Sequence, residues 1–192
     1  MIVYDTEAAA DAVAREGLLD RVMGQARFTK TSARFRDGRR PAAGLSLVAR
    51  DGDAIVGTVR LWHAAVFGQA DARPVLLLGP LAVDPSRRDR GIGAALMRLA
   101  IAKAAEAGHA AVILVGDPAY YERFGFSAAA TGAMRLPGPY EPHRLLALEL
   151  QPGALAGAAG LVLPTGAPAE RLETVEAVFG TAPVVDRLRK AG

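Results

Sequence analysis

Residues 78–100 read LGPLAVDPSRRDRGIGAALMRLA, and this stretch decides the fold. Three arginines and two glycines separate an apolar, strand-like run from a segment with the apolar spacing of a helix. The first N–H groups of a helix have no partner inside it and lie at the positive end of its dipole. The pattern therefore predicts an anion-binding site where the strand passes into the helix.

The two glycines, Gly91 and Gly93, allow several interpretations. The simplest is that they only let the loop turn into the helix. A dinucleotide site needs its glycines directly after the strand and a third small residue where this chain has Leu96, so that interpretation fails. A P-loop needs Gly-Lys-Ser or Gly-Lys-Thr, which the chain lacks. ATP or GTP chemistry is therefore not expected.

A third interpretation matches more of the residues. The segment RRDRGIGA (87–94), entered from LAVDP, resembles the acetyl-coenzyme A (acetyl-CoA) signature of the GNAT N-acetyltransferase superfamily, with Arg88, Gly91 and Gly93 at the pattern's positions. The later segment AYYERFGF (119–126) resembles the family's second motif at about the expected distance. The resemblance covers roughly residues 45–150, and ELQPGALAG also resembles the C-terminal part of the YhbS-like subgroup.

The resemblance implies that the anion is the pyrophosphate of coenzyme A (CoA) and that acetyl-CoA is the cosubstrate. It implies that the sheet opens beside the first strand of the motif, so that pantetheine pairs with the main chain there, and Gly79-Pro80 is consistent with a bulge or splay. One of Arg87, Arg88 and Arg90 would reach the ribose phosphate. The cofactor-binding residues implied are Leu81, Ala82, Val83, Arg88, Asp89, Arg90, Gly91, Ile92, Gly93 and Ala94.

The catalytic chemistry is limited by what the chain lacks. There is no cysteine, no G-x-S-x-G motif and no clustered Ser, His and acid that would form an acyl-enzyme. The resemblance implies direct attack of an amine on the thioester, with Tyr121 protonating the departing thiolate. Tyr120 is the alternative, although its place in YYERFGF matches a core aromatic of the family.

A general base is not evident from the sequence. A lysine-like amine has a pKa of about 10.4, so deprotonating it requires a base, a water chain or a desolvated site. Many family members have a glutamate on the strand before the loop, but VLLLGPLAV (75–83) contains no acid. His63 is a candidate, acting directly or through water, and the alternative is that it is structural.

Composition excludes several other classes of site. Without cysteine, and with His63, His109 and His143 far apart, no metal site is expected. The net charge of only +3 and the lack of aromatics interleaved with arginines disfavour a nucleic-acid binder. The N-terminal segment is acidic where a signal peptide would be basic, and the chain has no run of ~20 apolar residues, so neither a signal peptide nor membrane contact is expected. The expected location is the cytoplasm. The protein is expected to be a monomer or a homodimer.

The pattern of elements predicts an α/β fold, a mixed central β-sheet flanked by helices, as in the GNAT acyltransferases. Asp51-Gly52-Asp53 marks a hairpin, and residues 8–24 predict one or two amphipathic helices with Val13 and Leu18 on the apolar side. Residues 1–150 are expected to form the GNAT domain. Residues 151–192 are expected to add a short strand and a helix packed on it, with the helix stripe Leu172, Val175, Val178 and Phe179.

The expected function is an N-acetyltransferase that acts on a small-molecule or peptide amine. The competing function is a non-catalytic acyl-CoA sensor or interaction module on the same fold. Tyr121 favours the enzyme, whereas the missing glutamate leaves room for the sensor. The acceptor depends on loops around residues 24–44 and 62–74, so its identity does not follow from the fold.

Overall fold

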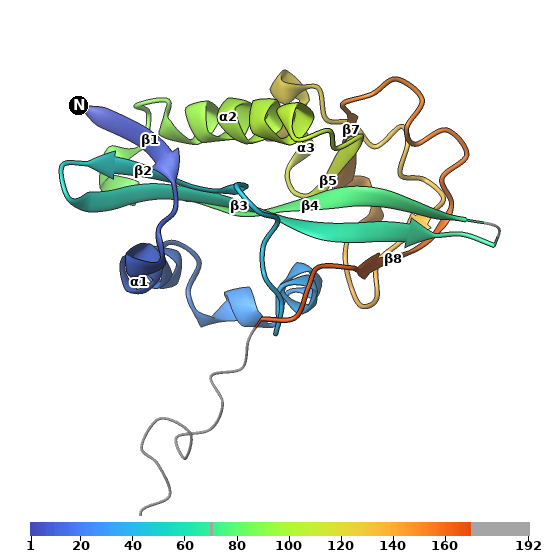
Figure 1. Cartoon of the computed structure of the whole chain (residues 1–192), viewed down its shortest axis with the longest axis horizontal. Coiled ribbons are helices and arrows are strands. Elements are labelled where there is room, and N and C mark those ends of the chain that lie inside the picture. The colour runs from blue at the N-terminus through green and yellow to red at the C-terminus, as the bar shows by residue number, and fades with distance from the viewer. Residues whose placement is uncertain (70, 170–192) are drawn as a thin grey trace, which may run out of the picture.

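A computed structural model describes residues 1–69 and 71–169 and shows one mixed sheet flanked by helices (Figure 1). The sheet runs in the order β1-β2-β3-β4-β5-β7, and β8 pairs with β3 and β6. This confirms the predicted fold class.

The strands are β1 (Ile2–Thr6), β2 (Ser46–Asp51), β3 (Ala54–Phe67), β4 (Ala72–Val83), β5 (Ala111–Val115), β6 (Met134–Arg135), β7 (Leu145–Glu149) and β8 (Gly160–Pro164). The α-helices are α1 (Ala12–Met23), α2 (Ile92–Glu106) and α3 (Pro118–Tyr121). The 3-10 turns are η1 (Ala9–Asp11), η2 (Gln25–Phe28), η3 (Thr31–Phe35), η4 (Pro85–Arg87), η5 (Glu122–Phe124) and η6 (Pro142–Arg144).

The predicted hairpin joins β2 to β3. Asp51 pairs with Ala54, so the turn contains only two residues, and Gly52 at its first position has a φ of 61°. Glycine adopts this left-handed conformation without the steric cost that a Cβ would bring. The local Asp-Gly signal was therefore sufficient to predict this turn.

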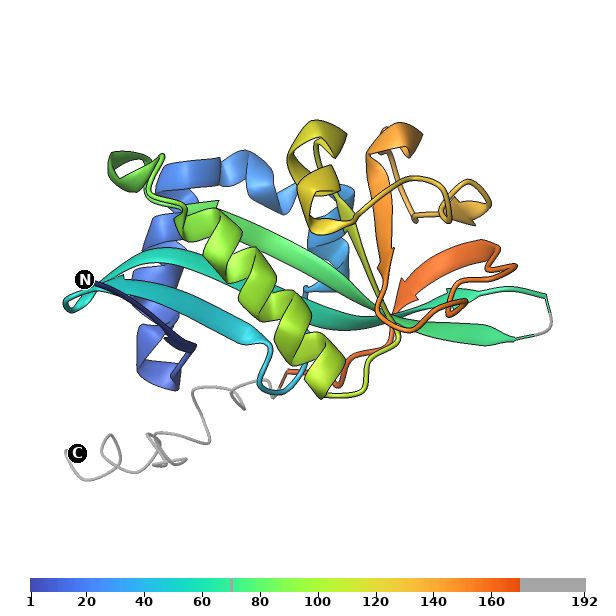
Figure 2. The ribbon, with the colours of Figure 1, turned by 90° about the horizontal axis from the view of Figure 1, so that it is seen from above.

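The sheet opens between β4 and β5. These parallel strands pair only at Leu76 with Val112 and at Leu77 with Ile113. On its other edge, β4 has an irregular register against β3, because Val59 pairs with Leu81 but Leu61 pairs with Leu78. The extra residue of β4 lies at Gly79-Pro80, which confirms the predicted bulge and splay. Figure 2 shows the two strands diverging beyond their shared point.

Helix α2 covers one face of the sheet. Ile92, Leu96 and Met97 are buried against the apolar side chains of the strands beneath. The helix approaches closely at Gly57 of β3, where an added Cβ would lie 2.9 Å from side-chain atoms of Ile92 and Leu96. This packing holds the first turn of α2 over the sheet, beside the end of β4.

Helix α1 and the turns η2 and η3 lie on the opposite face, as Figure 1 shows for α1. The helix is continuous through Gly17, so that glycine does not divide it. Val13 is 85% exposed, and the expectation that it belongs to the apolar side of the helix is wrong. Leu18 and Leu19 are buried as expected, but Arg15 is only 5% exposed. The buried side of α1 is partly ionic, which apolar spacing does not show.

Residues 151–169 extend from β7 back to the sheet. Leu155, Ala158 and Val162 are buried in the apolar cluster on the α1 face, and β8 pairs with β3 from Phe67 to Ala64. The expected helix with Leu172, Val175, Val178 and Phe179 lies outside the described residues. None of the helices in the described part of the chain combines the length and the hydropathy of a membrane span.

Candidate active site

The loop between β4 and α2 presents main-chain N–H groups. Asp84 caps η4 by accepting from the amide and the hydroxyl of Ser86. The backbone then reverses through Asp89 and Gly91, whose φ angles are 63° and 73°. In the described part of the chain, the six amides from residue 89 to residue 94 donate no hydrogen bond. The start of α2 therefore offers consecutive free donors, as the sequence predicted, at the positive end of a fifteen-residue helix.

The three arginines of this loop differ in their partners. Arg87 and Arg90 extend to Asp51 at the β2–β3 turn, with N–O distances of 3.2 and 3.7 Å. The exposed Arg88 side chain forms no ion pair with any described residue. Of the three arginines, Arg88 is the one whose charge is left for a ligand.

The end of β4 has an open edge toward β5. The amide of Asp84 donates to the carbonyl of Val56 on β3. Main-chain groups alternate in direction along a strand, so Ala82 also faces β3, whereas Leu81 and Val83 face the gap. Leu81 and Val83 thus have polar main-chain groups available for an added, strand-like ligand. Ala82 lies between them but directs its main chain to β3.

Tyr121 lies at the end of α3, beside this gap. Asp117 caps the helix by accepting from the amide of Ala119, and Pro118 occupies the first helical position. The ring of Tyr121 lies against Gly116, where an added Cβ would come within 2.1 Å of it. Burial raises the pKa of the Tyr121 phenol to about 12, with a smaller contribution from Tyr120. The phenol therefore stays protonated throughout the neutral range.

Tyr120 occupies a different place from Tyr121, although the two rings meet edge to face with centroids 4.9 Å apart. Its hydroxyl is 2.9 Å from the position that a Cβ on Gly93 would take, so it lies at the first turn of α2. Arg123 lies over its ring at 4.1 Å. Tyr120 is half-buried rather than a fully buried core aromatic, and it faces the anion-binding turn rather than the gap.

Two pockets meet at the gap. The smaller, of about 110 Å³, lies beside the open edge of β4, and its walls include Leu78, Pro80, Leu81, Val115, Tyr121 and Arg36. The larger, of about 450 Å³, lies on the α1 face, and its walls include Glu16, Arg27, Arg36, Arg60, Trp62 and Pro80. Arg27, Arg36 and Pro80 line both pockets, so the two spaces adjoin.

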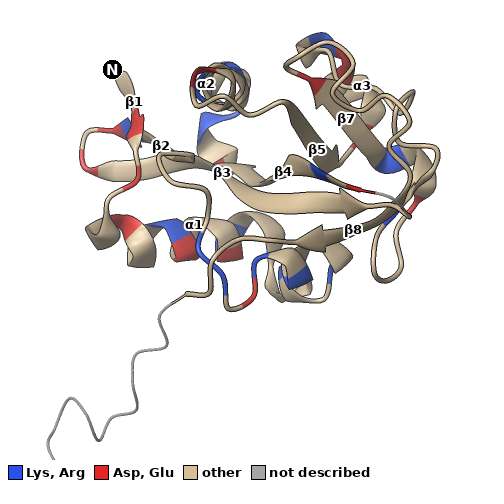
Figure 3. Cartoon of the chain, turned by 45° about the vertical axis from the view of Figure 1, so that its right-hand side comes forward, with Lys and Arg blue, Asp and Glu red and all other residues tan. Residues whose placement is uncertain are grey.

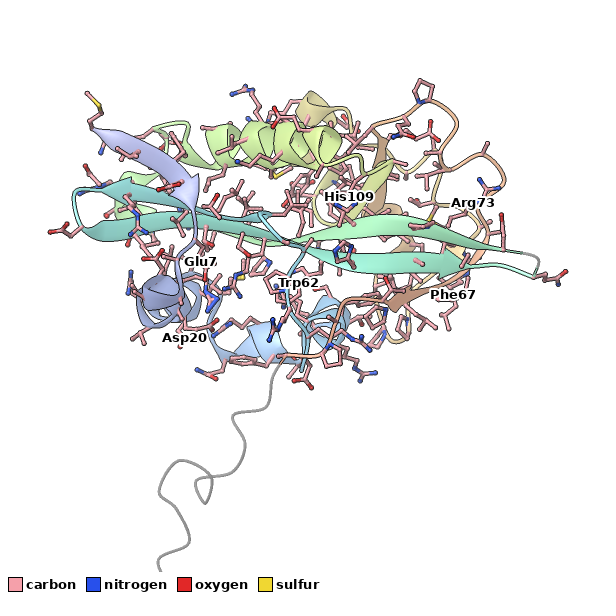
Figure 4. The ribbon with its side chains drawn as sticks, in the orientation of Figure 1. Glu7, Asp20, Trp62, Phe67, Arg73 and His109 are labelled. Carbon is pink, nitrogen blue, oxygen red and sulfur yellow. The ribbon has the colours of Figure 1, made fainter. Side chains whose placement is uncertain are left out.

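Ion pairs hold part of the charged wall of the larger pocket. Arg27 pairs with Glu16 and Asp20, and Arg60 forms a two-pronged pair with the buried carboxylate of Glu7. Figure 3 shows acidic and basic residues side by side along α1, and Figure 4 shows Glu7 and Trp62 on the same side of the sheet as Asp20. These pairs place the wall residues from α1 and β3 in a defined geometry.

The candidate base His63 is not in this site. Neighbouring residues of a strand point to opposite faces, and Trp62, the residue before it, lines the larger pocket. His63 instead lies beside His109, with ring centroids 5.4 Å apart, and neither histidine lines the two pockets. Burial and then the charge of His63 lower the pKa of His109. Within residues 1–69 and 71–169, no three acidic or histidine side chains gather as metal ligands would.

Sequence analysis named the segments that supply most of the larger pocket's wall, but not the individual side chains. Arg27, Arg36 and Asp37 come from the 24–44 segment that was expected to shape the acceptor site, but Glu16 and Arg60 were not singled out. A run of arginines at 34, 36, 39 and 40 was the available signal. It did not distinguish surface arginines from those that point into a pocket.

Comparisons with known proteins agree with this geometry. The model of the acetyltransferase (GNAT) family matches residues 14–126, more than half of the chain. The uncharacterized N-acetyltransferase YhbS of Escherichia coli K12 is 37% identical over 119 residues, which is 62% of this chain and 70% of that protein. The uncharacterized N-acetyltransferase YjhQ of the same strain is 34% identical over 128 residues, covering 63% and 69% of the two chains.

Solved structures show the same relationship. The crystal structure of E. coli YhbS in complex with CoA has a TM-score of 0.72 and 31% identity, covering 85% of this chain and 89% of that one. A GNAT family acetyltransferase from Brucella melitensis in complex with acetyl-CoA has a TM-score of 0.54 and 26% identity, covering 77% and 96%. The opened sheet, the free amides at the start of α2 and these matches together place the chain in the GNAT acetyltransferase family.

Proposed function

We propose that this protein transfers the acetyl group of acetyl-CoA directly to an amine, without an acyl-enzyme. The observation that carries the proposal is the convergence of Tyr121, the open edge of β4 and the two adjoining pockets at one gap in the sheet. Neither pocket wall contains a serine, histidine and acid together that would form an acyl-enzyme. The amine would reach the thioester from the larger pocket.

The proposed cofactor site follows from the groups left without partners. The amides of residues 89–94 would bind the pyrophosphate of CoA, and Arg88 would add a charge-assisted contact. Leu81 and Val83 would pair with pantetheine as an added strand, and Ala82 would lie between them with its main chain directed to β3. The relatives solved with CoA and with acetyl-CoA support this placement.

Tyr121 is the proposed acid. As the neutral amine nitrogen bonds to the carbonyl carbon, the C–S bond breaks and the sulfur takes up negative charge. The nitrogen passes its proton to solvent water, and the thiolate is protonated in turn to give CoA. The phenol of Tyr121 has a pKa of about 12, whereas a cysteine-like thiol has a pKa of about 8.5, so complete proton transfer from the phenol to the thiolate is unfavourable. We therefore assign Tyr121 a hydrogen bond to the developing thiolate, which lowers the barrier before proton transfer is complete.

Deprotonation of the amine is assisted by the charge of the pocket. Like charges nearby disfavour the ammonium form and so lower the amine's pKa. Arg36 is a partly buried cation of this wall that forms no ion pair with any described residue, whereas Arg27 and Arg60 are already paired with carboxylates. The cationic wall would supply part of the effect for which many relatives use a glutamate.

The remaining features of the proposal come from the sequence. Residues 1–150 would form the acetyltransferase domain, and residues 151–192 an extension packed on it. The protein would act in the cytoplasm without a metal, as a monomer or homodimer, on a small-molecule or peptide amine. Nucleic acid and membrane are not proposed as partners.

The proposal is tested by thiol release from acetyl-CoA in the presence of amines, peptides and aminoglycosides, with CoA binding followed by calorimetry. We expect CoA to bind and at least one class of amine to release thiol. CoA binding without thiol release from any amine would favour the acyl-CoA sensor. Failure of CoA to bind would contradict the cofactor site itself.

A further inference from the structure

Arg36 differs from the other arginines of the pockets because, among the described residues, it is both partly buried and unpaired, whereas the unpaired Arg34 of the larger pocket is exposed. Arg27 and Arg60 are held by carboxylates, and Arg39 donates to the carbonyl of Gly166. The Arg36 side chain forms no hydrogen bond or ion pair with any described residue, although it is partly buried and lines both pockets. It is a cation without a counter-charge at the junction between Tyr121 and the larger space.

The surroundings of Arg36 disfavour its charge. Burial, and to a smaller extent the nearby charge of Arg27, lowers the pKa of Arg36 to about 10. The carboxylate of Glu16 raises this pKa, but by less than burial and Arg27 lower it. The described wall of the smaller pocket holds Arg27, Lys30 and Arg36 and no acid. The wall of the larger pocket adds Glu16, which is already paired, and the exposed Asp37. An anionic group of a ligand beside Arg36 would therefore neutralise the unpaired positive charge of its guanidinium.

We propose that the acceptor is a small primary amine that carries an oxyanion, a carboxylate or a phosphate, and that Arg36 binds this oxyanion. A guanidinium presents paired N–H donors that match two oxygens of either group. Arg36 and Tyr121 line the same small pocket, so one molecule can place its anion on Arg36 and its amine at the gap. The larger pocket, of about 450 Å³, lies in the range of small-molecule sites and has room for an amino-acid-sized ligand.

This inference rests on the proposed function for the reaction, but its test does not need turnover. The probes are matched amines: ω-amino acids from β-alanine to 6-aminohexanoate against the alkylamines of the same length, and 2-aminoethyl phosphate against ethanolamine. Each is titrated by calorimetry into the CoA-saturated protein at pH 7.5, where Arg36 is charged. We expect an anionic member to bind about 10- to 100-fold more tightly than its neutral partner. The two arms distinguish carboxylate from phosphate.

Variants assign the preference to Arg36. Arg36→Gln is expected to remove the discrimination while leaving the affinity for CoA unchanged, and Arg36→Lys to retain part of it. Arg73→Gln is the charge-matched control, because Arg73 pairs with Asp71 in an exposed ion pair away from both pockets (Figure 4). Thermal unfolding of each variant shows that it remains folded.

Several outcomes would overturn the inference: equal binding of anionic and neutral amines, binding of neither, discrimination that survives in Arg36→Gln, or a loss of CoA affinity in that variant. A loss of CoA affinity in Arg36→Gln would show that Arg36 binds the cofactor rather than the acceptor. If wild type discriminates but no amine releases thiol, the proposed transfer fails while the oxyanion site stands.

Discussion

Tyr121 and Tyr120 are adjacent in sequence, yet the fold gives them different surroundings. Tyr121 lines the gap beside β4, whereas the Tyr120 hydroxyl lies against the first turn of α2. The motif pointed to Tyr121 through its place before Glu-Arg-Phe-Gly-Phe, and the structure places it beside the open edge of β4, where we propose that the thiolate departs. The difference between the two tyrosines can be tested directly.

Tyr121→Phe removes the hydroxyl and leaves the ring that packs on Gly116. We expect kcat to fall by about 10² to 10⁴, with little change in KM for acetyl-CoA, because the hydrogen bond forms as the sulfur departs. Tyr120→Phe is the matched control and should act on CoA affinity more than on kcat. A large loss of kcat in Tyr120→Phe alone would show that the acid is Tyr120.

The raised pKa of Tyr121 also predicts a pH effect. Its folded pKa of about 12 exceeds the ordinary value of 10, so the folded state holds this proton more tightly than the unfolded state. The stability that this contributes is complete below pH 10 and is lost as the pH rises through 12. Unfolding free energies between pH 9 and 12 should fall more steeply for wild type than for Tyr121→Phe. Parallel curves would contradict the buried phenol.

At the scale of elements, the junction of β4 and α2 is the part most directly encoded in the chain. Arg88, Gly91 and Gly93 lie within one loop and one helical turn, so sequence spacing fixes their geometry. The free amides of residues 89–94 reflect the general property that the first turn of a helix has unpaired donors. The tertiary contribution is the closeness of α2 to β3, for which Gly57 leaves room.

Gly91→Glu places a carboxylate where the pyrophosphate is proposed to bind. We expect CoA affinity to fall at least 10-fold, because like charges would meet at the helix start. Any side chain at position 91 is strained, since its φ is 73°. Gly91→Ala therefore controls for strain, and calorimetry compares the two. Equal affinities for CoA in Gly91→Glu and Gly91→Ala would contradict the site.

At the scale of the whole molecule, the ion pairs beneath the sheet join segments far apart in sequence. Glu7 follows β1, Arg15 lies on α1 and Arg60 on β3, and the Glu7 carboxylate meets both arginines. The Glu7 side chain is buried, so the charges are only weakly screened. The pocket wall and the stability of this layer therefore depend on the same carboxylate.

Glu7→Gln leaves the partly buried Arg60 without its counter-charge and leaves Arg15 with Glu16 as its remaining ion-pair partner. Breaking a buried pair in this way destabilises by about 3–5 kcal/mol, measured as the free energy of unfolding in urea. Asp71→Asn, which breaks the exposed pair with Arg73, is the control and should cost less than about 1 kcal/mol. A similarly small cost in Glu7→Gln would show that the network does not hold this layer.

The C-terminal strand is expected to support the same face. Val162 of β8 is fully buried, so Val162→Ala should lower the free energy of unfolding by about 2 kcal/mol through lost burial and the cavity left behind. Leu161, its exposed neighbour on the strand, provides the control Leu161→Ala. Limited proteolysis should leave residues 152–168 intact in wild type. Rapid cleavage there with an active core remaining would show the extension to be dispensable.

The sequence by itself determined the local features. The Asp-Gly hairpin, the bulge at Gly79-Pro80, the anion-binding start of α2 and the family motifs follow from short-range rules, because each depends on residues within one turn or one loop. Only the tertiary structure decided that Arg15 is buried, that His63 faces away from the gap and that Arg36 lies unpaired between two pockets. Those outcomes depend on the face of the sheet to which each side chain points and on the distant carboxylates that lie near it. The spacing of apolar residues carries no information about ion pairs between segments about 50 residues apart, such as the pair of Glu7 and Arg60.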